Sequence, residues 1–390
     1  MKNQRADARL SSAGSGLFAL LVAVCVLFSA IPAPAQSEIR IRFSLDRAID
    51  GTAAPLFLAI DKGYFKEQGI DVVVEPASTP MEAITRLALA NGAAEPTHDL
   101  SIGDINALIR YRDQNPPTGI QAVFIVYDKP TYALIGRKSR GVQFVKDTEN
   151  RKVAAPAVDP AAQVWPLFAK LNAIDTSKVT ILNVGLQVRV PMLVSGEVDA
   201  LLGSNFAAFA DLKDRGVAAD DLVVFLMADY GIQLYGSAIL ASAQFQAEQP
   251  EAIKGFLRAY VRALRDTVQK PEDAIEQVLK RMQGARKEVE LERLKIVVEN
   301  NIKPFDPKAE TVGASIRSVR RLLRTARAVL HLQEQAQARR YFRRGLLPAR
   351  RNPSRPPAAQ RERRNSRLFS GLRRYLRIGQ NHSSRHNRAF

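Results

Sequence analysis

Polar and small residues follow several short apolar runs of this sequence, at points where a chain would leave a β-sheet. Asp50 and Thr52 come soon after the run at 39–45, and Asp104 directly follows the run at 100–103. In open α/β sheets a ligand lies beyond the carboxyl ends of the strands, where loops and helix N-termini meet. We therefore predict a hydrogen-bonding site for a small molecule, formed by Asp50, Gly51, Thr52, Ser78, Thr79, Gly103, Asp104, Asp159, Ala161, Gln187, Arg189, Ser204, Asn205 and Tyr235.

Four of these residues have a second interpretation. Asp and Thr side chains often accept hydrogen bonds from the free N–H groups of a helix's first turn. Each of the four precedes a helical stretch and could be an N-cap: Asp50, Thr79, Asp104 and Asp159. Both interpretations stay open at the level of sequence.

Residue patterns typical of catalysis are missing from the sequence. Cys25 is the only cysteine, and His98 is the only one of four histidines that precedes residue 313. We find no metal-ligand spacing, nucleophile elbow or phosphate-binding loop. The sequence therefore predicts a binding protein and no enzyme, with no cofactor and no metal.

The elements that would position these residues alternate between β-rich and helical stretches. This pattern is typical of α/β layers with mostly parallel sheets. A body of about 260 residues exceeds what one small sheet needs, so we expect two domains. Strands are predicted at 39–45, 72–75, 100–103 and 120–127, and in a second series that begins near Thr131, at 152–155, 179–183, 200–203 and 222–226.

Helices are predicted at both ends of this body. Residues 55–75 contain an apolar helix that ends at Gly63, an aromatic turn that ends at Gly69, and a run of β-branched residues. Glycine is favoured where a chain leaves a helix in a left-handed conformation. Amphipathic spacing predicts further helices at 250–270, 271–283 and 288–300.

Residues 1–35 have the features of a secretory signal peptide. Lys2, Arg5 and Arg9 precede an apolar run at 17–31, and Ala33-Pro34-Ala35 forms a small-x-small cleavage pattern. The alternative is an uncleaved membrane anchor, for which the run is short. We therefore expect a cleaved, exported protein in the periplasm.

The positive charge belongs to one end of the chain. The net charge is +18, but residues 313–390 hold 21 Arg, no Lys and only two acidic residues. The remaining 312 residues hold 36 basic and 37 acidic groups. Arginine without lysine suggests a hypothesis, a frameshift near Gly313, which the coding DNA can test. The alternative is a disordered basic arm that binds nucleic acid or anionic lipid.

Five segments, in order, resemble the periplasmic substrate-binding proteins of ABC importers. The resemblance extends over about residues 38–312 and is strongest to the nitrate, sulfonate and taurine binders and to the thiamine-pyrimidine-precursor group. The segments are 55–75, Ile102-Gly103-Asp104 with Ala107-Leu108, Tyr127-Asp128-Lys129-Pro130, Val194-Ser195-Gly196-Glu197-Val198-Asp199-Ala200, and Asp229-Tyr230-Gly231-Ile232-Gln233-Leu234-Tyr235-Gly236.

The resemblance implies a two-lobed periplasmic binding protein fold of type II, with a ligand cleft between lobes joined by two crossing segments. Lobe 1 would comprise 36–128 and 233–312, lobe 2 would comprise 129–232, and the crossings would lie near 126–130 and 230–237. Such proteins close around a ligand by hinge motion and deliver it to a membrane permease. The expected partners are therefore an ABC permease and a small-molecule ligand, without nucleic acid, and we expect a monomer.

The residue types in the predicted cleft bear on the ligand. Its carboxylates are those of Asp50, Asp104, Asp128 and Asp159. Sulfonate or nitrate would prefer helix N-termini with Arg or Lys, so a neutral or amine-bearing heterocycle such as a pyrimidine precursor is favoured. One alternative within the same superfamily is a thiamine-pyrimidine synthase, whose cysteine-rich motif has no counterpart here. Another is a nucleic-acid-binding protein driven by the Arg-rich tail.

Overall fold

The computed structural model describes residues 38–89, 97–115 and 118–302. The predicted signal peptide and the Arg-rich tail lie outside these residues. Within them, none of the helices combines the length and hydropathy that crossing a bilayer requires.

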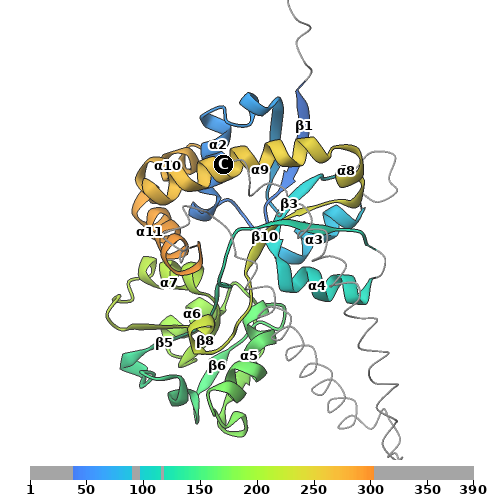
Figure 1. Cartoon of the computed structure of the whole chain (residues 1–390). Coiled ribbons are helices and arrows are strands. Elements are labelled where there is room, and N and C mark those ends of the chain that lie inside the picture. The colour runs from blue at the N-terminus through green and yellow to red at the C-terminus, as the bar shows by residue number, and fades with distance from the viewer. Residues whose placement is uncertain (1–37, 90–96, 116–117, 303–390) are drawn as a thin grey trace, which may run out of the picture. The chain divides into compact units, whose positions relative to one another are not determined.

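The first sheet contains the strands at the start of the body and one strand from much later in the chain (Figure 1). Its order is β2-β1-β3-β10-β4. β3 pairs in parallel with β1, with Leu100 opposite Phe43. The strands are β1 Ile39–Ser44, β2 Ile70–Glu75, β3 Leu100–Asp104, β4 Gln121–Ile125 and β10 Ser237–Ala241.

Helices pack on this sheet as their apolar spacing predicts. The long helix α9 contacts both α2 and β2, and its Phe256 stacks on Phe65 with ring centroids 4.9 Å apart. Gly63 and Gly69 both have a positive φ, as the sequence of the first helix-to-strand return predicts. The helices are α2 Ala54–Asp61, α3 Pro80–Leu89, α4 Ile105–Gln114, α8 Ala243–Glu248, α9 Pro250–Gln269, α10 Pro271–Leu279 and α11 Lys287–Val297, which continues into the π-helical turn η7 Val298–Ile302.

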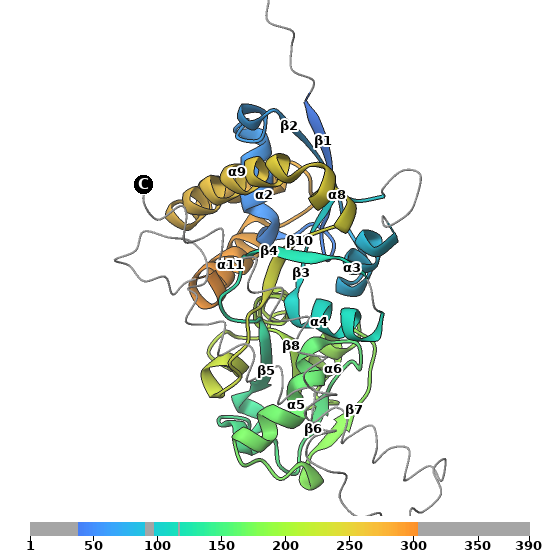
Figure 2. The same cartoon turned by 45° about the vertical axis from the view of Figure 1, so that its right-hand side comes forward.

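The second sheet has the order β7-β6-β8-β5-β9 (Figure 2). β6 pairs in parallel with β7 and β8. Its strands are β5 Tyr132–Arg137, β6 Lys152–Ala154, β7 Thr180–Leu182, β8 Ala200–Ser204 and β9 Leu222–Leu226. Its helices are α5 Pro160–Leu171, α6 Arg189–Ser195 and α7 Asn205–Asp214. Short 3-10 turns complete both parts, at Gly51–Ala53 (η1), Lys66–Gln68, Lys138–Arg140, Val145–Thr148, Thr176–Lys178 and Met227–Tyr230.

The chain passes between the sheets twice, where the sequence predicts it. β4 of the first sheet leads through residues 126–131 to β5 of the second, and β9 leads back through 227–236 to β10. The two-sheet α/β architecture is therefore confirmed, whereas the division into lobes at 128 and 233 stays a prediction.

Two strands depart from the expected parallel order. β10 is antiparallel to β3 and β4, and β5 is antiparallel to β8 and β9. Each is the first strand after a crossing. The crossings leave from the carboxyl ends of β4 and β9. A strand that continues directly from a crossing therefore starts at the carboxyl-end side of its sheet and runs in the opposite direction to the parallel strands. Because no helix intervenes to return the chain to the far edge, it cannot pair in parallel.

Candidate functional site

A pocket opens at the carboxyl end of β1, beside both crossings. Tyr127 contributes from the first crossing, Ser237 from the start of β10, and Tyr260 from α9. Two of the predicted ligand residues line it, Asp50 and Thr52. The full lining is Phe43, Leu45, Asp46, Arg47, Ala48, Asp50, Thr52, Ala53, Leu56, Ile102, Tyr127, Ser237 and Tyr260.

The turn at residues 50–52 is held by its own hydrogen bonds. Asp50 Oδ1 accepts from the Thr52 N–H at 2.9 Å and from the Thr52 hydroxyl at 2.5 Å, so Asp50 is also the N-cap of η1. Gly51 is buried against α11, where a Cβ atom would lie 2.1 Å from the Glu290 carbonyl oxygen. Gly51 therefore permits close packing under the pocket and does not line it.

The charged groups of the pocket are two carboxylates and one guanidinium. Arg47 donates to both oxygens of Asp46, at 2.8 and 3.0 Å. Burial disfavours the charged guanidinium, but the carboxylates of Asp46 and, to a smaller extent, Asp50 outweigh this effect and raise the pKa of Arg47 above its ordinary value. Among the side chains that line the pocket, no second cation is present to pair with the Asp50 carboxylate. The lining therefore carries a net negative charge.

Two tyrosines supply neutral polar groups to the same pocket. Tyr127 is 4% exposed and Tyr260 is 3% exposed. Burial raises the pKa of both phenols, so both remain protonated at neutral pH. The pocket thus offers phenol hydroxyls and aromatic surface beside its carboxylates.

Asp104 and Tyr235 belong to a buried cluster that joins the two sheets. The Tyr132 hydroxyl, at the start of β5, donates to Asp104 Oδ2 at the end of β3. Asn106 Nδ2 donates to the Tyr132 oxygen at 3.1 Å and to the Tyr235 carbonyl at 2.8 Å. Asp104 also accepts from the Ala107 N–H at 2.8 Å, and burial raises its pKa. Both predicted residues are therefore engaged in contacts within the chain.

Asp159 and Arg189 form a buried ion pair in the second sheet's part of the chain. Asp159 also caps α5 by accepting from the Ala161 N–H at 2.9 Å, and Arg189 donates to the Leu202 carbonyl at 3.3 Å. This pairing neutralises Arg189 as a partner for an anionic ligand. The neighbouring Gln187 is exposed, and Ala161 is fully buried.

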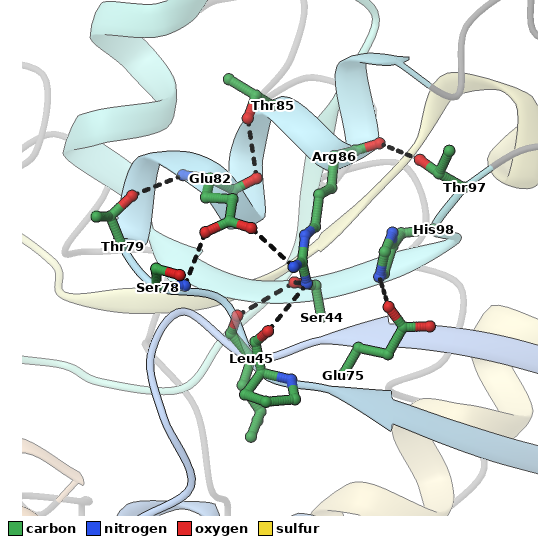
Figure 3. Close-up of polar contacts among 11 residues, drawn as sticks. Ser44, Leu45, Glu75, Ser78, Thr79, Glu82, Thr85, Arg86, Thr97 and His98 are labelled. Atoms are coloured by element: carbon green, nitrogen blue, oxygen red, sulfur yellow. Dashed lines mark hydrogen bonds and ion pairs between the residues drawn. The ribbon is translucent and has the colours of Figure 1, made fainter.

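Ser78 and Thr79 directly precede helix α3 (Figure 3). Glu82 Oε2 accepts from the Ser78 N–H at 2.7 Å, and Thr79 Oγ1 accepts from the Glu82 N–H at 3.2 Å. Arg86 fastens this turn to β1, because it donates to Glu82 Oε1 at 2.7 Å and to Ser44 Oγ at 3.2 Å (Figure 3). The capping interpretation is thus confirmed for Thr79, as for Asp50, Asp104 and Asp159.

Ser204 and Asn205 begin α7 in a second contact between the sheets. Asn301 Nδ2 donates to the carbonyls of Lys129 and Pro130 at 3.3 and 3.2 Å, so its Oδ1 accepts from Asn205 Nδ2 at 3.1 Å. Among the described residues, Ser204 Oγ and Asn205 Oδ1 are buried without a hydrogen-bond partner. Gly103, predicted beside Asp104, packs against Leu240, and a Cβ atom there would lie 3.1 Å from Leu240 Cδ1, so a side chain would require Leu240 to shift.

The pocket thus brings together Asp50 and Thr52 of the predicted set, and the remaining members lie outside its lining. Sequence reasoning missed Asp46, Arg47 and Tyr260. The first two directly follow the predicted strand at 39–45, so their position was a usable signal. Tyr260 lies on an amphipathic helix, where its side chain cannot be distinguished from a core aromatic by pattern alone.

Two known proteins illustrate what this chain is similar to in sequence. A formylaminopyrimidine-binding protein of Halalkalibacterium halodurans is 25% identical over 258 residues, which cover 65% of this chain and 74% of that protein. A 4-amino-5-hydroxymethyl-2-methylpyrimidine phosphate synthase of Schizosaccharomyces pombe is 24% identical, covering 56% of this chain and 62% of the synthase. The chain thus spans 62–74% of the length of these two relatives.

A solved structure shows the same fold. The periplasmic aliphatic sulphonate-binding protein of Escherichia coli superposes with a TM-score of 0.56 at 15% identity, covering 80% of this chain and 94% of that one. The predicted periplasmic binding protein fold is therefore confirmed. A sequence profile described as NMT1/THI5 like matches residues 51–274, more than half of the chain. The chain accordingly belongs to the NMT1/THI5-like family.

Proposed function

We propose that this chain is the periplasmic solute-binding component of an ABC importer, which binds a small organic solute and delivers it to a membrane permease. The observation that carries the proposal is the pocket at the end of β1, which is lined by Tyr127 of the first crossing and by Ser237, the first residue of β10 after the second crossing. A site at the connections between two sheets changes shape when the sheets move relative to each other, as hinge closure around a ligand requires. Relatives named as binding proteins support this function.

The charge of the pocket supports an amine-bearing, neutral or cationic heterocycle as the solute. Asp46 neutralises Arg47, and the Asp50 carboxylate remains as an acceptor for an N–H donor. A sulfonate or nitrate would meet a net negative lining, although the fold is shared with sulfonate binders. The formylaminopyrimidine-binding relative carries a name that agrees with this chemistry.

The alternative function is a pyrimidine phosphate synthase, since several relatives bear that name. We favour binding because the chain has no cysteine after Cys25 and one histidine before residue 313. That histidine, His98, pairs with Glu75 of the edge strand β2 (Figure 3), with 3.2 Å between Nε2 and Oε2. His98 is not among the residues that line the pocket. Appearance of a phosphorylated pyrimidine in an assay of the purified chain would favour the synthase.

Thermal-shift screening against aminopyrimidines, alkanesulfonates and nitrate tests the proposal. A ligand present at a hundredfold excess over its Kd stabilises the folded state by about 2.7 kcal/mol, which a melting curve detects. We expect aminopyrimidines to raise Tm, and Asp50→Asn to weaken their binding about tenfold by removing the charge on the acceptor.

Asp175→Asn is the matched control. Asp175 accepts from the Ser177 N–H and hydroxyl, the same bonding as at Asp50, but it lies in the second sheet's part of the chain away from the pocket. Equal losses of affinity in the two variants would contradict the assignment of the pocket. Shifts with sulfonate or nitrate alone would contradict the proposed ligand class.

A further inference from the structure

Helix α11 contacts elements of both sheets. It packs on η1 and α10, which belong with the first sheet, and on α7, which follows β8 of the second (Figure 1). The contact with α7 includes ion pairs of Lys213 with Glu292, Arg293 with Asp211, and Arg286 with Asp214. α11 is therefore a further physical link between the two sheets, in addition to the crossings and the contacts at Asp104 and Asn205.

The Arg293–Asp211 ion pair is part of a series of contacts that reaches the turn at residues 50–52 beside the pocket. The Gly51 N–H donates to Glu290 Oε2 at 2.7 Å. Arg293 Nε donates to Glu290 Oε1 at 3.2 Å, and its Nη2 donates to Asp211 Oδ1 at 2.5 Å. The contacts from Gly51 through Glu290 and Arg293 to Asp211 are called the α11 relay below. They connect the turn at 50–52 with helix α7.

The middle of the α11 relay is shielded from water. The side chains of Glu290 and Arg293 are 8% and 14% exposed. The other ion pair between these helices, Lys213–Glu292, has side chains that are 35% and 31% exposed and makes no contact with η1 in the relay. Charge-assisted hydrogen bonds are stronger where solvent is excluded, because screening falls. The contact between Glu290 and Arg293 should therefore be firmer than the Lys213–Glu292 pair, whereas the α7 end of the relay is more open to solvent, since the Asp211 side chain is 43% exposed.

The pocket end of the relay has little freedom to move independently. Gly51 lies between the two pocket residues Asp50 and Thr52, and its Cα faces the Glu290 carbonyl with no space for even a methyl group. Burial raises the pKa of Glu290, while Arg293 and the Gly51 N–H oppose that rise by stabilising the carboxylate. A shift of α11 must therefore displace the turn that carries the Asp50 acceptor.

We propose that Glu290 is a positioning residue for the ligand-binding turn, and that Arg293 couples this turn to α7 through Asp211. The proposal rests on the proposed function, because it takes the pocket at 50–52 as the solute site. When the second sheet moves relative to the first, α7 carries Asp211 with it. The α11 relay then shifts the turn at residues 50–52. Solute affinity and closure are then linked through α11.

Hydrogen exchange at the Gly51 amide of the full chain tests the relay without any solute. Glu290→Ala removes the acceptor and should speed exchange about tenfold, the effect of losing one charge-assisted hydrogen bond. Glu290→Gln keeps an acceptor and should restore most of the protection. Asp211→Asn acts from the far end, and we expect it to speed exchange at Gly51 about threefold.

Glu292→Gln is the matched control, since it breaks an α7–α11 pair that does not reach Gly51. If Asp211→Asn affects Gly51 no more than Glu292→Gln does, the relay is wrong. Should Glu290→Ala fail to fold, the comparison of Asp211→Asn with Glu292→Gln still decides.

Calorimetric titration with 4-aminopyrimidine gives a second readout. Asp211→Asn should raise its Kd about fivefold while Glu292→Gln leaves it unchanged. An unchanged Kd in Asp211→Asn would overturn the coupling to the pocket. If 4-aminopyrimidine does not bind the unmodified chain, the proposed ligand class fails, and the exchange data decide the relay on their own.

Discussion

For the predicted ligand residues, side-chain type and position correctly indicated the helix starts but did not distinguish helix capping from ligand binding. Asp104, Asp159 and Thr79 were placed correctly at helix starts, but their oxygens accept from the N–H groups of their own helices. A sequence cannot separate capping from ligand binding here, because both functions put an acceptor at the same end of a strand. Of the four predicted caps, all of which the structure describes, Asp50 alone also lines the pocket.

Asp104 should give the stability of this protein an unusual pH dependence. Burial raises its pKa, while Arg110 and the Tyr132 hydroxyl act in the opposite direction. Between the ordinary pKa and the raised one, the folded state binds more protons than the unfolded state, so this group's contribution to the free energy of unfolding rises as pH falls. We expect the unmodified chain to gain stability relative to Asp104→Asn between pH 7.5 and pH 4.5, as measured by urea denaturation.

Asp175→Asn is the control. Hydrogen bonds from Ser177 hold the pKa of Asp175 below its usual range, so its stabilising contribution is nearly constant over this pH interval and is lost only at lower pH. The same trend in both variants would contradict the assignment of a raised pKa to Asp104.

At the scale of elements, the helix-to-strand return at 55–75 is explained by its contact with α9. The Tyr64 hydroxyl donates to Asp266 Oδ2 at 2.7 Å, and the Arg262 guanidinium lies 3.7 Å from the centre of the Tyr64 ring. Phe65 stacks on Phe256 of the same helix. The aromatic pair after Gly63 thus anchors the return to a helix about 200 residues later in the chain.

Tyr64→Phe should lower the free energy of unfolding by about 1 kcal/mol, because it removes the hydrogen bond to Asp266 and keeps the ring under Arg262. Tyr64→Leu should cost more, since the cation–π contact is also lost. Urea denaturation measures both. Tyr111→Phe, on a different helix, controls for the loss of a hydroxyl, and equal effects of Tyr64→Phe and Tyr64→Leu would exclude a contribution from Arg262.

The elements predicted from sequence agree with the structure wherever a helix or turn follows an apolar run. The strands at 100–103 and 222–226, for example, are found within one residue of their predicted ends. β10 was not predicted, and β5 was noted only as the start of a series. Both are short apolar runs that follow a crossing, and periodicity alone cannot identify the sheet to which such a run belongs.

For the whole molecule, the ion pairs between α7 and α11 predict a dependence on salt. Several of these side chains are partly exposed, such as Arg286 at 63% and Asp211 at 43%. At 1 M salt the Debye length falls to about 3 Å, so exposed pairs weaken. Spin labels at Lys66→Cys and Lys146→Cys, in a Cys25→Ser background, should report a broader distance distribution at 1 M NaCl than at 0.05 M.

Labels at Lys66→Cys and Glu251→Cys, both in the first sheet's part of the chain, are the control and should give an unchanged distribution. A response to salt in this control pair equal to that of the first pair would show general loosening and contradict a specific role for α7 and α11.

The place of β10 has a consequence for the order of folding. It pairs with β3 on one side and β4 on the other, yet it is synthesised only after the whole second sheet. Until residue 241 is available, β3 and β4 lack the strand that lies between them, and the first sheet cannot be completed. Most of the body must therefore emerge before its first half becomes stable.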